Sequence, residues 1–415
     1  ILSKKFNAQI KGYIGYSLFV SPLKYSLYYS IKWLIGNFFN LGTFKIYRSF
    51  NTRKIFKPKV TNEIEVQSNK IFNNLKKKIK KKEDILKIKI FGINFGDLIY
   101  DTYIKAYYLP TIDLEDPKFK IFFKDYITLI LFWFSYFKNH NVKAVISSHP
   151  VYSYVLPLRI AANKNILAYV LDIEHLFKIT KKNPHQLSDT KYFKKIASKI
   201  DKTDLRKGKI LAKKRLLSRF NGGEAINIDY PDLQKSSYHK NFQKRAIKKN
   251  NRIKVLICAH EYFDAVHIYG ENLFTDFYEW MEFLGKLSNK TPYDWYIKTH
   301  INQPGKYKIY QPLTIKILND FVKKYKNIKI LPINYSHKQI LQEKIDYVLT
   351  VYGSIAYEYP FFNIPVINAT KNHPQRSYNF SITPKTKKEY ERILKNLKNF
   401  KHKINKNEIY EYYYL

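Results

Sequence analysis

The chain has 415 residues, 45% hydrophobic and 17% aromatic, which favours two folded domains that each bury a core. A single cysteine excludes a disulfide framework and a multi-cysteine zinc site, and fits a reducing cytoplasm. The net charge, 74 − 33 = +41, points to an anionic partner such as nucleic acid, anionic lipid or an anionic substrate. AT-rich coding, which enriches Lys, Ile, Asn, Tyr and Phe, would place the same charge on solvated faces.

The first 85 residues are basic and aromatic, with helical spacing around Tyr25, Tyr28 and Trp33. Two interpretations stay open: helices packed on the domain behind them, or an interfacial segment resting on anionic lipid. No stretch reaches the ~20 uninterrupted apolar residues of a membrane-spanning helix. The basic run 76–82 fits a solvated helix end or linker, with attraction to lipid as the alternative.

An N-terminal α/β domain is expected over residues 86–250. Its elements alternate between short apolar strands and helices, as in parallel βαβ units. We expect strands at 86–91, 142–147 and 166–171, a loop at 92–97, and helices at 98–103, 119–137 and 152–163. Residues 180–250 are expected to be helical and strongly basic, ending in a linker at 248–251.

A second, doubly wound α/β domain is expected over residues 251–415. The predicted strands are 253–258, 294–298, 328–331, 347–351 and 365–368, and the predicted helices are 273–288, 313–325, 336–342 and 354–361. Cys258 falls inside the first of these apolar strands, where it is expected to be a small buried hydrophobe. Ligands of such sheets bind beyond the carboxyl ends of the strands, so the residues just after each strand are the site candidates.

The run 259–267 follows the first of these strands and contains two histidines and two carboxylates. Within it, His260 and Asp264 are candidates for substrate contact or acid–base chemistry. Loop packing and capping are the structural alternative. No distinctive coordination spacing is present, so no metal ligand is predicted.

Two further strand ends suggest a phosphate site. Lys298 and His300 place a cation beside an imidazole, which suits a phosphate or carboxylate. The strand ending near Val351 breaks at Gly353, and Ser354 stands where a helix would begin, so backbone N–H groups and a hydroxyl could hold a phosphate there. A plain helix cap is the alternative for Ser354.

Glu358 lies one helical turn after Ser354 and on the same face, where its carboxylate could bind the hydroxyls of a ribose. In the N-terminal half, Asp97 and His149 follow predicted strands. Asp97 could activate a hydroxyl nucleophile or simply cap a helix. The glycines at 92 and 96 form neither a P-loop nor a dinucleotide fingerprint.

With these residues in view, the chain resembles bacterial capsule and surface-polysaccharide biosynthesis glycosyltransferases of GT-B architecture. The likeness is carried by three stretches: 96–102 with 110–112, 260–267 with 272–280, and 295–300 with 353–365. It implies two Rossmann-like domains facing a cleft, an acceptor glycan or lipid-linked acceptor on the N-terminal domain, and a nucleotide-sugar donor on the C-terminal domain. It also implies no obligatory metal, and no other cofactor is expected. The single cysteine favours a cytoplasmic location, and the basic surface favours a peripheral position on the inner membrane face as one possibility within it.

In the expected mechanism, Gly353 and Ser354 hold the donor phosphates and Glu358 holds the ribose. Lys298 and His300 offset charge on the departing phosphate. The base that activates the acceptor is one of four residues: Asp97, His149, His260 or Asp264. One rival function is a nucleotide-sugar epimerase of similar fold. The other is a basic nucleic-acid-binding protein, although the sequence contains no recognised nucleic-acid-binding motif.

Overall fold

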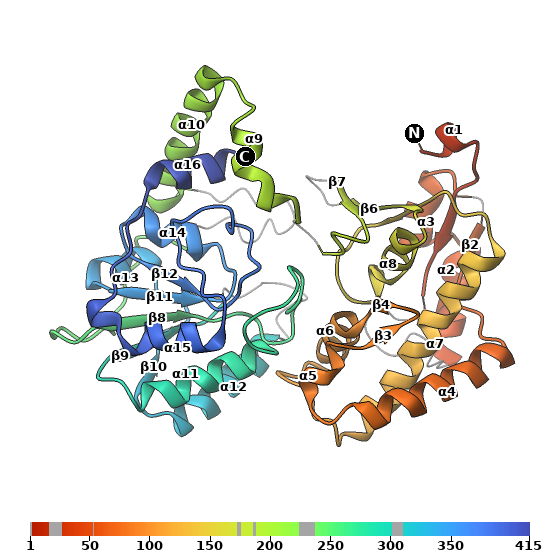
Figure 1. Ribbon diagram of the computed structural model, residues 1–415, viewed down its shortest axis with the longest axis horizontal. Helices are drawn as coiled ribbons and strands as arrows, with labels where there is room; N and C mark the ends of the chain where they lie inside the picture. Colours follow the sequence, from red (N-terminus) through yellow and green to blue (C-terminus); the bar gives the residue numbers. More distant parts are fainter. Residues whose placement is uncertain are drawn as a thin grey trace. The chain divides into compact units, whose positions relative to one another are not determined.

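The computed structural model describes two compact units, Ile1–Gln186 and Leu187–Leu415, which Figure 1 colours from red to yellow-green and from green to blue. Each unit is described by itself. The described residues are 2–15, 27–52, 54–171, 176–185, 188–223, 237–300 and 310–415.

The C-terminal unit is built on one five-stranded, fully parallel sheet. Its order is β10-β9-β8-β11-β12, with β8 at Lys254–Cys258, β9 at Asp294–Lys298, β10 at Ile328–Ile330, β11 at Tyr347–Thr350 and β12 at Val366–Asn368. All residues of β8, β9, β11 and β12 are buried, as expected of strands covered on both faces. The five predicted strands are confirmed to within one residue at each end.

Helices follow the strands of this sheet in alternation: α11 (Phe277–Ser288), α12 (Tyr310–Lys324), α13 (His337–Glu343) and α14 (Ile355–Phe361). The chain runs from β8 to β10 in one direction and then crosses back to β11 and β12, so right-handed crossovers place α11 and α12 on one face and α13 and α14 on the other. One buried cluster joins α13 and α14 to the sheet through Ile340, Tyr359 and Val348. The predicted doubly wound arrangement of this domain is therefore confirmed.

The segment before β8 also packs with the C-terminal unit, through α9 (Phe193–Ala197) and α10 (Lys202–Phe220). Helix α10 packs along α16 (Lys406–Tyr414), and Leu216 and Phe220 lie in a cluster with C-terminal residues. The compact units thus divide near residue 186, whereas the sequence predicted a linker at 248–251. The reason is that the apolar stripe of α10, hidden among basic residues, is buried against the C-terminal half.

The N-terminal unit contains three small sheets among its described residues. The first has the order β5-β6-β7, in which β5 (Ala144–Ser147) and β6 (Leu167–Leu171) are parallel and β7 (Leu176–Ile179) is antiparallel to β6. The second is the antiparallel pair β3 (Lys89–Ile90) and β4 (Ile93–Asn94). The third is the parallel pair β1 (Lys11–Tyr13) and β2 (Lys54–Phe56). The expected single doubly wound sheet is not what these residues form.

The predicted strand at 86–91 is replaced by a tight hairpin. Phe91 and Gly92 both have positive φ, 50° and 78°, which reverses the chain between β3 and β4. Residues 92–94 were predicted to be loop, but Ile93 and Asn94 form β4. Helix α6 (Gly96–Tyr107) then begins directly after the hairpin.

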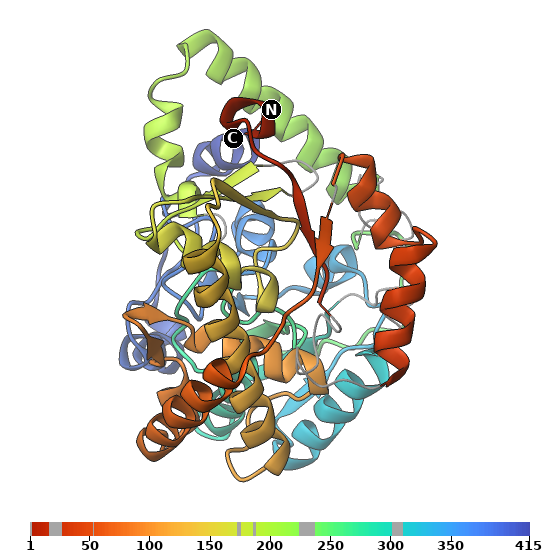
Figure 2. The same ribbon diagram turned by 90° about the vertical axis from the view of Figure 1, so that its right-hand side faces the viewer.

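Helices supply most of the N-terminal core. Helix α7 (Pro117–Asn139) packs against α4 (Asn62–Lys78) and is flanked by α6 and α8 (Leu156–Asn163) (Figure 1, Figure 2). The remaining helical elements are α1 (Leu2–Phe6), α2 (Leu27–Phe38), α3 (Thr43–Ser49), α5 (Lys82–Ile85) and η1 (Tyr152–Tyr154), with η2 (Ser188–Tyr192), α15 (Lys387–Lys395) and η5 (Leu397–Asn399) in the C-terminal unit. No helix in the described part of the chain has the length and apolar content to cross a bilayer.

Candidate functional site

The order of the C-terminal strands places the topological switch point of the sheet between β8 and β11. The chain leaves β8 toward β9 but leaves β11 toward β12, so the connections diverge at this point, where open α/β sheets bind ligands. His260 follows β8 and Gly353 follows β11. The two meet there, since a Cβ on Gly353 would lie 3.8 Å from His260 Cε1.

His260 forms hydrogen bonds with the segment that follows β11. Its Nε2 accepts hydrogen bonds from the backbone N–H groups of Val351 (3.2 Å) and Tyr352 (3.4 Å), and lies 3.0 Å from the hydroxyl of Thr350. Because N–H groups only donate, Nε2 must be unprotonated. Burial and, to a smaller extent, the charge of His300 lower the pKa of His260 to about 3. The imidazole is therefore neutral at physiological pH, and Nδ1 is the nitrogen left for a ligand.

Lys298 is the last residue of β9 and its side chain is buried, with 6% of the residue exposed. Its ammonium donates to the carbonyl of Ile333 at 2.9 Å. Within the residues that the structure describes, no carboxylate pairs with it, and burial lowers the pKa of the Lys298 ammonium. Cys258 lies beside it in the sheet register, but burial raises the pKa of that thiol to about 12, so the thiol is neutral. An anion at this position would satisfy an otherwise uncompensated charge.

Lys298 lies near another buried basic residue, His337. The pKa of His337, in α13, is lowered to about 3 by burial first and then by the charges of Lys298, Arg219 and His239. His337 Nδ1 lies 2.8 Å from the hydroxyl of Tyr359. Basic side chains from β9, α10 and the segment before β8 therefore lie close enough to His337 to act on its pKa.

Glu358 is the carboxylate within this basic region, and it is 1% exposed. Arg219 donates to its Oε1 at 3.0 Å, and the hydroxyl of Tyr238 donates to its Oε2 at 2.9 Å. Both oxygens are thus occupied inside the unit. The sequence predicted a ribose contact for Glu358; the geometry gives the carboxylate internal partners that a ribose would have to displace.

The remaining C-terminal candidates are exposed. His300 and Asp264 lie on the surface, the first directly after Thr299 and the second in the loop after β8. Ser354 occupies the N-cap position of α14, but its side chain makes no capping hydrogen bond; its carbonyl accepts from the N–H groups of Tyr357 and Glu358. The structure therefore brings together His260, His300, Gly353, Ser354 and Lys298 at one sheet edge and turns Glu358 inward.

Asp97 and His149 lie in the N-terminal unit. Arg159, 4% exposed in α8, donates to both carboxylate oxygens of Asp97 at 2.5 and 2.8 Å, and His185 Nδ1 lies 3.7 Å from Asp97. His149 is exposed at the end of β5, with Nδ1 2.9 Å from the carbonyl of Ser148. Asp97 is thus an ion-paired carboxylate, and His149 is the more accessible of the two.

Four residues of these clusters were missed from the sequence: Arg159, Arg219, Tyr238 and His337. Arg159 left a signal, because a lone arginine in the apolar run 156–162 implies a buried acidic partner. No group of three or more His, Cys, Asp or Glu side chains in the described ranges is arranged to hold a metal ion.

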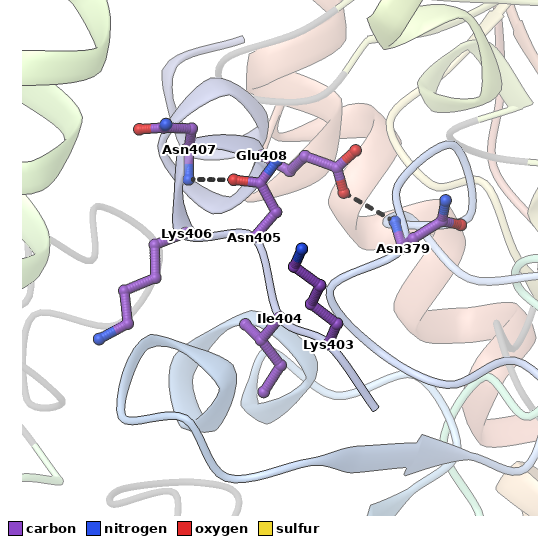
Figure 3. A pocket seen from close by; sticks show the side chains of 7 residues that line it. All are labelled: Asn379, Lys403, Ile404, Asn405, Lys406, Asn407 and Glu408. Atoms are coloured by element: carbon purple, nitrogen blue, oxygen red, sulfur yellow. Dashed lines mark hydrogen bonds between the residues drawn. The ribbon is translucent and has the colours of Figure 1, made fainter. Parts of the chain in front are cut away.

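A pocket of about 420 Å³ lies elsewhere on the C-terminal unit, at the start of α16 (Figure 3). Its polar groups already serve local structure: Asn405 caps the backbone N–H of Asn407, and Glu408 accepts from the N–H of Asn379. None of the predicted site residues lines it. The lining residues are Asn379, Lys403, Ile404, Asn405, Lys406, Asn407 and Glu408.

No protein-family description and no curated protein matches the chain. Two solved structures are similar, both from Thermosulfurimonas dismutans KpsC. Its beta Kdo 2,4 transferase is 12% identical over 65% of this chain and 78% of that one, with a TM-score of 0.39. Its beta Kdo 2,7 transferase is 13% identical over 68% and 79%, with a TM-score of 0.36. Similarity this low establishes neither a shared fold nor a shared reaction.

Proposed function

We propose that the chain is a glycosyltransferase that moves a sugar from a nucleotide-sugar donor to a capsule or other surface-polysaccharide acceptor. The observation that carries this proposal is Lys298, a buried ammonium without a carboxylate partner among the described residues, at the carboxyl edge of a doubly wound parallel sheet. A nucleotide sugar supplies the required anion in its phosphate.

The transfer reaction needs positive charge at this edge. When the bond from the anomeric carbon to the phosphate oxygen breaks, negative charge builds on the departing phosphate. Lys298 and His300 would stabilise that charge, while Gly353 and Ser354 would line the phosphate. Because these protein cations would stabilise the departing phosphate, we expect no obligatory metal. Glu358 would act as a positioning residue that fixes Arg219 and Tyr238.

The acceptor hydroxyl must lose a proton as it attacks the anomeric carbon. Asp97, His149, His260 and Asp264 stay the candidates for the base. To act as the base, His260 would first have to give up its Nε2 hydrogen bonds, since Nε2 accepts from backbone N–H groups and Nδ1 of the neutral ring carries the proton.

Lys298→Met tests the donor site. We expect one class of nucleotide sugar among CMP, UDP, GDP and dTDP forms to raise the melting temperature of the wild-type protein. The variant should bind that ligand about 100-fold more weakly, because it loses a buried charge pair with the phosphate. Without ligand, the variant should be at least as stable as the wild type, since an unpaired buried charge is removed.

Lys329→Met is the matched control, because Lys329 lies on the neighbouring strand β10 with its side chain exposed. It should leave both ligand response and stability unchanged. Equal ligand stabilisation of wild type and Lys298→Met, or no response of the wild type to any nucleotide sugar, would overturn the proposal. Nucleotide release that depends on added acceptor then separates a transferase from an epimerase.

A further inference from the structure

Helix α2 in the N-terminal unit exposes a continuous apolar stripe. Ile31, Leu34, Ile35 and Phe38 follow one another at i, i+3, i+4 and i+7, which places them on one face of the helix. All four are exposed, Phe38 to 83%. In a soluble helix this face normally packs on a core, so its exposure indicates a binding surface.

The stripe belongs to a preformed helical hairpin whose inner face is already packed. Trp33 meets Phe44 edge to face at 5.3 Å, and Gly36 lets the Phe44 ring approach so closely that an added Cβ would lie 2.7 Å from it. Arg48 on α3 donates to Asn37 on α2 at 3.1 Å. The contact between α2 and α3 is therefore already made by other side chains, and the apolar stripe of α2 is not needed for it.

Further apolar side chains extend this surface across the turn and onto α3. Phe39, Leu41, Ile46 and Phe50 are each more than half exposed. We call α2, α3 and the turn between them the apolar hairpin; Figure 2 shows its two helices in red at the periphery of the unit.

The charged side chains of the sequence segment that contains the apolar hairpin are of one sign. The first 62 residues contain no Asp or Glu and eleven Lys or Arg. Among these, Lys32, Lys45 and Arg48 are exposed on the hairpin itself. Exposed apolar and aromatic side chains interspersed with cations complement a bilayer surface that carries anionic lipid.

We propose that the apolar hairpin docks on the surface of a membrane containing anionic lipid, with α2 lying in the interface. At 12 residues, α2 is about 18 Å long, against a hydrocarbon core of ~30 Å, so it rests in the interface and does not span it. A second copy of the chain is the less favoured occupant, because two molecules of net charge +41 repel each other. This inference is independent of the proposed donor site, which lies in the other unit.

Vesicle flotation tests the inference on the full chain. Wild-type protein should float with phosphatidylglycerol-containing vesicles and much less with phosphatidylcholine vesicles. The variant Leu34→Ser/Phe38→Ser/Phe39→Ser should bind the anionic vesicles at least about tenfold more weakly, since three side chains no longer enter the interface. Because all three are exposed, its melting temperature should match the wild type.

Ile210→Ser/Leu211→Ser/Leu217→Ser is the matched control, as it removes three exposed apolar side chains from the basic helix α10. This variant should bind vesicles as the wild type does. Wild-type protein that stays unbound, or equal binding by the hairpin variant, would overturn the inference. So would a lipid-free dimer that the hairpin variant converts to monomer, because a second copy would then occupy the surface.

Discussion

Replacement of Arg219 by methionine is expected to lower the free energy of unfolding of the C-terminal unit by about 3 kcal/mol. The reason is that the substitution leaves the buried carboxylate of Glu358 without its charged partner. Glu358 is 1% exposed and, among the described residues, would keep the Tyr238 hydroxyl alone as a hydrogen-bond partner. Denaturant unfolding at neutral pH, followed by circular dichroism, measures the loss.

Arg215→Met is the control for this prediction, since Arg215 lies on the same helix with its side chain exposed. It should change the free energy of unfolding by less than about 0.5 kcal/mol. The double variant Arg219→Met/Glu358→Gln should recover part of the loss, because no charge remains buried. If Arg219→Met unfolds like Arg215→Met, the ion pair does not stabilise the unit.

Lowering the pH from 7 to 5 is expected to cost the C-terminal unit about 6 kcal/mol of unfolding free energy, through three buried histidines. Burial lowers the pKa of His260 and His337 to about 3 and that of His373 to about 4. The unfolded chain binds protons on these groups near pH 6.5 and the folded unit does not, so stability is full above pH 6.5 and falls as the pH drops. Each contributes about 2 kcal/mol at pH 5.

The slope of unfolding free energy against pH gives the number of protons taken up on unfolding, expected to approach three near pH 5. His373→Gln should reduce that number by about one, because its imidazole is held between Gln375 and Thr383 and removed from water. Half-buried carboxylates with a lowered pKa, such as Glu279, lose their stabilising contribution mainly at lower pH, and the loss has the same sign as that of the histidines. A flat profile between pH 7 and 5.5 would contradict the assignment of these histidines as neutral and buried.

The C-terminal sheet could be predicted from the sequence because its strands are buried on both faces. Such strands appear as short, continuous apolar runs bounded by polar residues, and the predicted strand 294–298 coincides with β9. The strand ends also predicted which polar residues would follow the strands, and His260, Lys298 and Gly353 do lie at the carboxyl edge of the sheet; that they bind a ligand there stays a prediction.

The N-terminal unit was harder to predict because its topology depends on turns rather than on apolar runs. The reversal at Phe91 and Gly92 turns an expected strand into a hairpin, and phenylalanine at positive φ leaves no local signal. The domain boundary was missed for a related reason: the buried side of α10 is a sparse stripe among lysines and arginines.

Long-range pairing limited the prediction of the site. Arg219 and Glu358 are 139 residues apart in the chain, and no local pattern joins them. The sequence correctly placed Glu358 on the helix after Gly353, but could not show which way its carboxylate pairs. Residue type and strand position were predictable, whereas hydrogen-bond partners were not.

The chain has one cysteine, and it lies at the end of β8 directly beside Lys298. Its thiol is shielded and protonated in the native protein, so alkylating reagents can reach it only when this edge of the sheet opens. The rate of Cys258 alkylation is therefore a native, single-site reporter of breathing at the proposed donor site. An anion that closes the edge should slow the modification, and no label has to be engineered to see it.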